Sequence, residues 1–175
     1  MPDTKIRSTK ATALLREDHR KVKHLFAEYE KLGEDAPADS KVELFEQMRK
    51  ELTIHAQIEE EIFYPAIDEL KGEDEEAGEI VAESNEEHKI VKTLLEELSG
   101  LDPEDEQYDA KVKVLTENVK HHAEEEEEEM FPFFDELPKE RQDDISEQMR
   151  MRKAELESEY GEESPDDGEA GEDEE

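Results

Sequence analysis

Two thirteen-residue segments of the chain carry the same pair of metal-binding side chains. Residues 55–67 read HAQIEEEIFYPAI, and residues 122–134 read HAEEEEEEMFPFF. In each segment a histidine is followed four residues later by a glutamate, His55 by Glu59 and His122 by Glu126. On an α-helix this spacing places both side chains on one face, one turn apart. Each pair can therefore offer an imidazole nitrogen and a carboxylate oxygen to the same metal ion.

Two further histidines belong to a second repeat that precedes the first. Residues 17–32 (EDHRKVKHLFAEYEKL) align with residues 86–101 (EEHKIVKTLLEELSGL), so that His19 falls on His88. Both histidines stand at same-face helical spacing from apolar residues of their own segments, which predicts that they point inward. The chain is therefore a duplication of one helix pair, each copy with a lone His and a His-x-x-x-Glu.

Apolar spacing also distinguishes between neighbouring histidines. His122 shares a helix face with Leu115, Val119 and Met130, whereas His121 does not, so we expect His121 to face solvent. His24 lies five residues after His19 and should also point away from the core.

The resulting constellation predicts a metal centre. Four imidazoles and two carboxylates should meet inside the protein: His19, His55, Glu59, His88, His122 and Glu126. A buried carboxylate is costly unless it is paired or bound to metal, and neither glutamate has a Lys or Arg at same-face spacing on its own helix. Six N/O ligands are too many for one tetrahedral zinc ion. They suit two transition-metal ions about 3.5–4 Å apart, bridged by the carboxylates. This ligand set favours iron, with manganese or zinc as weaker candidates.

Four long helices are predicted to position these residues. Apolar residues recur with the helical period in four segments, about 8–31, 39–70, 75–98 and 103–134. Gly33 should end the first helix, and Asp102 should cap the fourth, with Pro103 at its first position. Pro65 should bend or stop the second helix. The short connections favour an all-α, up-down-up-down antiparallel four-helix bundle.

The predicted organisation is one bundle followed by two smaller elements. The bundle should cover residues 8–135 as two helix-pair repeats, about 8–71 and 75–135. A short fifth helix should follow within 136–160, and the acidic segment 161–175 should be a disordered tail. The aromatic residues near the two motifs, including Tyr64, are interpreted as core packing. Within the run Glu124–Glu129, Glu126 is the one residue assigned a role, and the others are interpreted as a solvated face.

Composition excludes several classes of function. The 175 residues include 45% charged and 33% apolar side chains, carry a net charge of −34 and contain no Cys. Disulfides, thiolate catalysis and iron–sulfur clusters are therefore excluded. The excess of acid argues against nucleic acid and anionic membranes as partners. No apolar run is long enough to span a membrane, and the N-terminus lacks the apolar centre of a signal peptide, so we expect a cytoplasmic protein.

Over residues 8–135 the chain resembles the hemerythrin family, specifically the bacterial hemerythrin-like HHE cation-binding domain. The resemblance implies a non-haem di-iron centre, with Glu59 and Glu126 bridging and the four histidines as terminal ligands. Oxygen-carrying hemerythrins have a further His one turn after the third helix's His, where this chain has Lys92, which puts oxygen carriage in doubt. They also place an Asp five residues after the last helix's His. Pairing His121 with Glu126 would restore that spacing. Ferritin-like di-iron bundles fit less well, because they use Glu-x-x-His.

Three functions remain open at this point. The first is a di-iron protein that binds or senses dioxygen, or handles iron. The second is a di-iron enzyme that decomposes peroxide or handles nitric oxide, using the position left open near Lys92. The third is a metal-free helical interaction protein. We favour the first, and the sequence identifies no protein partner.

Overall fold

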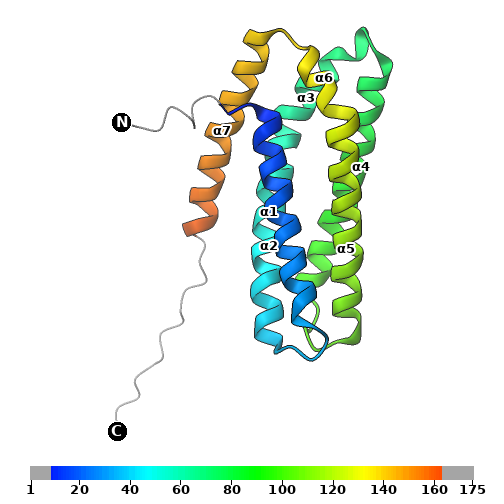
Figure 1. Cartoon of the computed structure of the whole chain (residues 1–175), viewed down its shortest axis with the longest axis vertical. Coiled ribbons are helices and arrows are strands. Elements are labelled where there is room, and N and C mark those ends of the chain that lie inside the picture. The colour runs from blue at the N-terminus through cyan, green and yellow to red at the C-terminus, as the bar shows by residue number, and fades with distance from the viewer. Residues whose placement is uncertain (1–8, 163–175) are drawn as a thin grey trace.

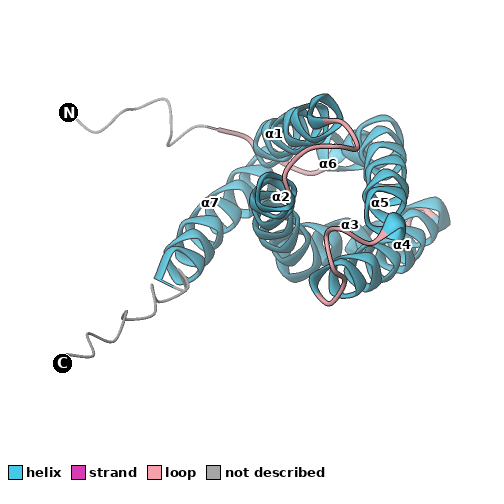
Figure 2. Cartoon of the chain, turned by 90° about the horizontal axis from the view of Figure 1, so that it is seen from below, coloured by secondary structure: helices cyan, strands magenta, loops and turns pink. Residues whose placement is uncertain are grey.

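A computed structural model describes residues 9–162, and the regular structure of this range is entirely helical. Four antiparallel rods form the bundle, which Figure 1 shows from the side and Figure 2 along its axis. The first and third rods are the helices α1 (Ala11–Leu32) and α4 (Glu75–Ser99). The second rod runs through α2 (Ala38–Ile58), η2 (Glu59–Phe63), α3 (Tyr64–Asp68) and η3 (Glu69–Gly72). The fourth runs through α5 (Glu106–Glu125), η4 (Glu126–Met130) and α6 (Phe131–Glu136). The predicted all-α bundle is confirmed.

The ends of the helices follow from capping residues, with one exception to the prediction. Gly33 ends α1 with a φ of 75°, a conformation that glycine adopts without strain. The fourth rod begins at Glu106, because Asp105 caps it by accepting a hydrogen bond from the Gln107 N–H at 2.9 Å. Asp102 was expected in that role. It starts a turn instead, which is closed by the Asp105 N–H on the Asp102 carbonyl at 2.9 Å and delays the helix by three residues.

Two apolar clusters fill the bundle and leave its middle to polar side chains. One cluster holds the aromatic residues of α3 and α6, and the other lies toward the α1–α2 and α4–α5 connections. On α1, for example, Leu15 belongs to the first cluster and Val22 to the second, with His19 between them. The same order occurs on α2, where His55 lies between Leu52 and Ile58. The candidate ligands therefore occupy one level of the bundle between two apolar layers.

The fifth helix, α7 (Lys139–Glu162), is present but is not short. It lies outside the ring of four rods, against α1 and α2 (Figure 2). Its 24 residues make it as long as the bundle helices, because it buries Ile145, Met149 and Leu156 and forms ion pairs with the bundle, such as Arg152 with Glu61 at 2.7 Å. Residues 161 and 162, predicted as tail, belong to this helix. The rest of the predicted disordered tail lies outside the described residues.

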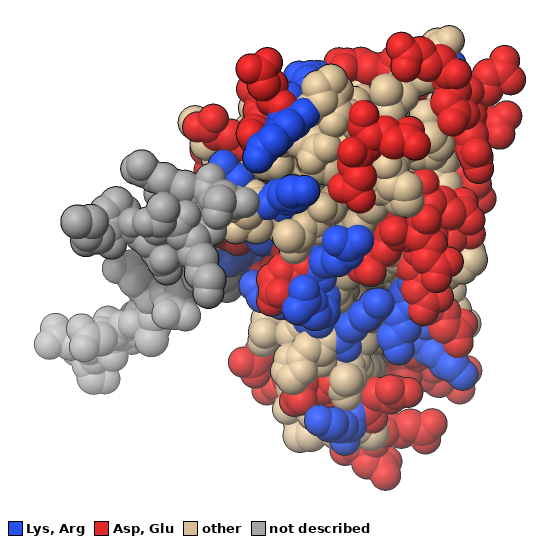
Figure 3. All heavy atoms as spheres, turned by 45° about the horizontal axis from the view of Figure 1, so that its top comes forward, with Lys and Arg blue, Asp and Glu red and all other residues tan. Residues whose placement is uncertain are grey.

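The surface is strongly acidic. On the face shown in Figure 3, acidic side chains gather along the right side and at the upper and lower ends, and a band of basic side chains crosses between them. Within residues 9–162, no helix has the length and apolar character needed to cross a membrane.

Candidate metal centre

The six predicted site residues come together in the middle of the bundle. They form two overlapping groups of buried side chains that share Glu59, and within each group the candidate ligand atoms lie within 4.8 Å of one another. The first group contains His19, His55, Glu59 and Glu126, and the second contains Glu59, His88 and His122. Because every rod contributes at least one of these side chains, the bundle as a whole builds the site.

Each carboxylate lies between histidines from both helix pairs. Glu126 places Oε1 3.4 Å from Nε2 of His19 and Oε2 3.3 Å from Nε2 of His122. Glu59 places Oε1 3.0 Å from Nε2 of His55 and 3.4 Å from Nε2 of His88. Each carboxylate therefore lies beside ring nitrogens from both halves of the duplication.

The two glutamates each begin a π-helical turn, η2 at Glu59 and η4 at Glu126. The N–H of Tyr64 donates to the Glu59 carbonyl and that of Phe131 to the Glu126 carbonyl, five residues back in each case. A proline follows directly, Pro65 or Pro132, which has no N–H and would crowd the carbonyl four residues earlier in a regular α-helix. The wider turn relieves this conflict, so the helix continues past the proline. Pro65 therefore does not stop the second rod.

Every candidate histidine also has a carboxylate on its outer ring nitrogen. These Nδ1 contacts join His19 to Glu127 (2.8 Å), His55 to Asp18 (3.0 Å), His88 to Glu60 (2.9 Å) and His122 to Glu87 (2.5 Å). Such a carboxylate fixes the tautomer so that Nε2 faces the metal, and it raises the basicity of the imidazole. The set obeys the duplication, since Asp18 and Glu87 each precede a lone histidine and Glu60 and Glu127 each follow a motif glutamate.

Sequence reasoning missed these four partners. Glu127 was interpreted as part of a solvated face, and Asp18, Glu60 and Glu87 were given no role. The role given to Glu126 alone within Glu124–Glu129 was too narrow, because Glu127 contacts His19. Their fixed position next to each ligand in both repeats was the signal that could have found them.

Tyr64 was expected to serve core packing alone, but its hydroxyl reaches the site. It donates to Oε2 of Glu126 at 2.8 Å and lies 3.0 Å from Nε2 of His88 and 3.2 Å from that of His122. In a regular α-helix, nine residues after His55, Tyr64 would point to roughly the opposite side. The π turn between them delays the helical phase by roughly one residue and brings the ring toward the centre.

The electrostatics of the centre favour bound protons when no metal is present. Burial alone lowers the pKa of His122, but contacts with Glu126 and Glu87 outweigh it and raise this pKa to about 10. Burial likewise opposes the charge on His55, yet Glu59 and Asp18 raise the pKa of His55 well above its ordinary value. The hydrogen bond from His88, supported by Lys92, lowers the pKa of Glu60 to about 2. A metal ion entering the centre would therefore displace protons.

Five buried atoms of the centre have no hydrogen-bond partner among residues 9–162: Nε2 of His19, Nε2 of His55, both carboxylate oxygens of Glu59, and Oε1 of Glu126. They lie close together without the alignment that a hydrogen bond needs. Unsatisfied buried polar atoms are rare in native proteins. Imidazole nitrogens and carboxylate oxygens that converge in this way fit transition-metal ions such as iron, manganese or zinc.

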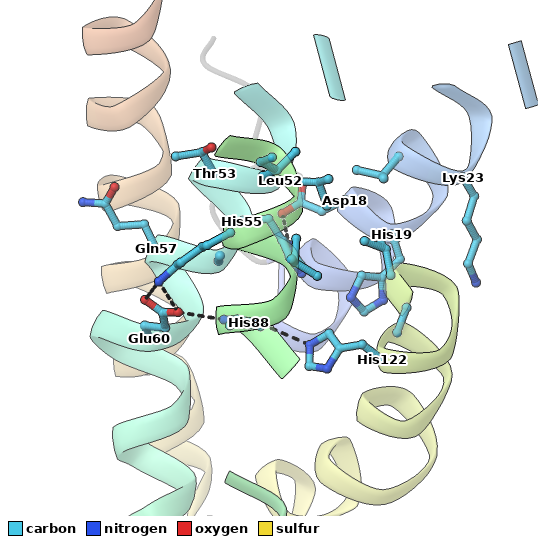
Figure 4. Close-up of a pocket in the computed structure, with 17 residues that line it drawn as sticks. Asp18, His19, Lys23, Leu52, Thr53, His55, Gln57, Glu60, His88 and His122 are labelled. Atoms are coloured by element: carbon cyan, nitrogen blue, oxygen red, sulfur yellow. Dashed lines mark hydrogen bonds and ion pairs between the residues drawn. The ribbon is translucent and has the colours of Figure 1, made fainter. Parts of the chain in front are cut away.

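A cavity of about 220 Å³ opens beside the histidines. Figure 4 shows His19, His55, His88 and His122 turned toward it, with Lys23 at its edge. Its wall is otherwise largely apolar and includes Val22, Leu52, Val91, Leu95, Val119 and Ala123. Lys92 also lines it, but its ammonium contacts both oxygens of Glu60 at 2.7 Å. The cavity gives a small molecule a place next to the candidate ligands.

The remaining histidines lie outside this centre, as predicted. The His121 side chain is 66% exposed and its Nε2 lies 3.1 Å from Glu125, not Glu126. The alternative pairing of His121 with Glu126 is therefore not found. The His24 side chain is 71% exposed.

The fold and the buried cluster together define a metal-binding four-helix bundle. The chain belongs to the hemerythrin HHE cation-binding domain family, whose model matches residues 10–134. Members of this family bind metal cations, typically iron.

Two known proteins are similar to the chain. A crystal structure of a hemerythrin HHE cation-binding domain-containing protein from Mycobacterium kansasii has the same fold, with a TM-score of 0.71 and 24% identity, covering 86% of this chain and 89% of that one. A DNA nickase from Nostoc sp. is 31% identical over 118 residues. The match covers 67% of this chain and 31% of the nickase, so the chain spans about a third of that protein's length.

Proposed function

We propose that this chain holds two non-haem iron ions in the centre of its bundle and uses them to bind or sense dioxygen, or to handle iron. Manganese and zinc are weaker candidates for the metal. In this assignment the two carboxylates bridge, and each ion takes two of the histidines as terminal ligands: His19 and His55 for one ion, His88 and His122 for the other. The observation that carries the proposal is the convergence of unpartnered ring nitrogens and carboxylate oxygens.

The geometry supports two ions better than one. The rings of His19 and His55 lie 4.9 Å apart, and so do the rings of His88 and His122. Glu59 and Glu126 each reach one member of both pairs. A single ion could use one pair of histidines and would leave the other pair without a ligand role.

The size and lining of the cavity support a very small ligand. Its volume of about 220 Å³ is smaller than the roughly 300–1,000 Å³ of pockets that hold drug-sized molecules. Bound iron would supply redox chemistry and coordination positions for dioxygen, peroxide or nitric oxide. The apolar wall would keep bulk water from the ligand, and Glu60 holds the ammonium of Lys92 at the edge of the cavity.

Decomposition of peroxide, or handling of nitric oxide, is the alternative function, and one observation favours it. The Tyr64 hydroxyl is a proton donor placed within 2.8–3.2 Å of Glu126, His88 and His122. A hydroxyl at this position could give its proton to a small molecule in the centre and recover it from a neighbouring group.

Metal content and spectra of the purified protein test the proposal. We expect about two irons per chain, lost in His55→Ala and retained in His24→Ala, because His24 lies on the exterior. Reversible spectral change with dioxygen and no peroxide loss would support binding or sensing, whereas sustained peroxide loss would support the enzyme. A purified wild-type chain that takes up no iron would contradict both and favour a metal-free interaction protein.

We propose no nucleic-acid or membrane partner and identify no protein partner. The relative from Nostoc sp. is named a DNA nickase and is roughly twice as long as this chain. A net charge of −34 would repel the phosphate backbone, so we do not extend that activity to this chain. The cytoplasmic location stays a prediction.

A further inference from the structure

The two halves of the duplicated bundle are covered differently on the outside. In the first half, Ile54 and Ile58 on α2 are buried in the same apolar cluster as Met149 and Leu156 of α7. The equivalent positions of the second half, 67 residues later, hold His121 and Glu125 on α5. Helix α7 lies against α1 and α2 and does not cover these positions on α5 (Figure 2). The second half therefore has polar side chains, exposed at His121 and half-buried at Glu125, where the first half is apolar and covered.

The difference extends to the charge next to the centre. In the first half, Asp18 holds Nδ1 of His55 and is neutralised by the ammonium of Lys153 from α7, at 2.5 Å. In the second half, Glu87 holds Nδ1 of His122 in the equivalent way. Among residues 9–162 the ion pairs give Glu87 no Lys or Arg. Within the described residues, Glu87 therefore lacks the counterpart of Lys153, whose ammonium neutralises the equivalent Asp18.

The side chains next to Glu87 are of types that can bind metal. His121 and Glu125 repeat the His-x-x-x-Glu spacing of the inner motif, one residue earlier, and Nε2 of His121 lies 3.1 Å from Glu125. Together with Glu87 they offer three ligand atoms that all lie within 4.8 Å of one another. The side chain of Glu87 is 22% exposed, that of Glu125 30% and that of His121 66%. An ion could therefore reach this group from solvent.

We propose that Glu87, His121 and Glu125 form a second, surface site for a divalent transition-metal ion of the Zn²⁺ class. One imidazole and two carboxylates are ligands that zinc accepts, and water would complete the coordination. Calcium and magnesium are weaker candidates, because they prefer oxygen ligands throughout. The ion would supply next to Glu87 the positive charge that Lys153 supplies next to Asp18.

The surface site adjoins the inner centre but does not depend on its function. Glu87 accepts the hydrogen bond of His122 through Oε2, so an ion on Glu87 would act on an inner ligand through one carboxylate. None of the three surface residues belongs to the two groups of inner ligands. The inference can therefore fail while the inner centre binds iron, and it can hold if the inner metal is not iron.

Zinc titration of the full chain tests the inference. The protein is purified with its resident metals, its metal content is determined, and Zn²⁺ is added in a calorimeter with excess Mg²⁺ present to occupy simple carboxylate clusters. We expect one equivalent of zinc beyond the resident metals, which stay bound. His121→Ala and Glu125→Gln should each weaken this binding at least about tenfold, because each removes a direct ligand and even the loss of an outer-shell partner costs about 10–100-fold.

His24→Ala is the matched control, because the chain carries a comparable exposed His-x-x-x-Glu on α1. There Nε2 of His24 lies 4.0 Å from Glu28, and no third ligand joins the pair in the groups found among residues 9–162. This variant should bind zinc as the wild type does. The inference is overturned if the wild type takes up no additional zinc, if zinc replaces resident metal, or if His121→Ala and Glu125→Gln both bind zinc as tightly as His24→Ala.

Discussion

Replacing Lys153 with Met should destabilise the protein and weaken its metal centre. Lys153 donates to Oδ1 of Asp18 at 2.5 Å, and the other oxygen of Asp18 contacts Nδ1 of His55 at 3.0 Å. Asp18 is 5% exposed, so little water reaches its carboxylate. Methionine keeps an unbranched apolar side chain for packing but removes the charge and the donor. The variant therefore isolates the link between α7 and the centre.

The expected loss follows from the hydrogen bond that disappears. A hydrogen bond to a charged group contributes about 1.5–3 kcal/mol, and the side chain of Lys153 is 20% exposed, so entering water should recover part of it. We expect the free energy of unfolding to fall by about 2 kcal/mol, which for a chain of this size lowers Tm by about 4–8 °C. Because Asp18 would hold His55 less firmly, metal affinity should also fall, by about tenfold or more.

Chemical denaturation of the metal-loaded protein measures the first effect, and metal competition with a chelator measures the second. Lys89→Met is the control, because Lys89 forms an ion pair of the same length, 2.5 Å, with Glu86, but both side chains are about 70% exposed. Lys89→Met should lower the free energy of unfolding by no more than about 0.5 kcal/mol. If Lys153→Met costs no more than Lys89→Met and binds metal normally, α7 does not support His55 and the reasoning fails.

Three further predictions concern other parts of the bundle. Glu59→Ala should lower metal content strongly and Glu128→Ala should not, because Glu128 is exposed; equal losses by elemental analysis would mean that the acidic residues act only as diffuse charge. Tyr64→Phe should reduce the difference in affinity between the first and second Fe²⁺ bound to metal-free protein, since the hydroxyl occupies one side of the centre; an unchanged anaerobic titration would contradict this. Burial opposes the low pKa of Asp109, but hydrogen bonds from Tyr29 and Lys41 lower it below the ordinary 3.8, so its stabilising effect is present above that pH and lost as pH falls through the lowered value. Asp109→Asn should therefore reduce the free energy of unfolding at about pH 7, and the deficit should shrink toward about pH 3; a deficit that is constant with pH would show that charge is not its cause.

The position of the ligands could be predicted from the sequence because helical periodicity is regular over the residues involved. His122 was distinguished from His121 by its apolar neighbours and by the repeat, and the structure places the first inside and the second outside. The duplication supported the same assignment, because the alignment of the two copies also selects His122. The helical register and the repeat were together sufficient to predict that six side chains meet inside the bundle.

The role of Tyr64 and the docking of α7 could not be predicted in the same way, for two different reasons. Tyr64 follows a π turn, and a single such turn shifts the phase of every later residue, so the regular period gives the wrong face. Helix α7 is nearly uniformly polar, and its docking depends on a few buried residues and on ion pairs with partners distant in the sequence, such as Arg152 with Glu61. The spacing of apolar residues along a helix gives no information about ion pairs between residues that are distant in the sequence.

The two halves of the duplication give the two sides of the centre different chemical surroundings. Tyr64 and Phe131 occupy equivalent positions 67 residues apart. The Tyr64 hydroxyl contacts His88 and His122, whereas the Phe131 ring stacks on His19 at 6.3 Å and offers no donor, so the first pair of histidines keeps bare ring nitrogens. Two ions held in these surroundings would differ in ligand field and in access to a proton. Tyr64 does not line the cavity, whereas all four histidines do, so this difference would reach a small molecule in the cavity through the histidines and any bound ions.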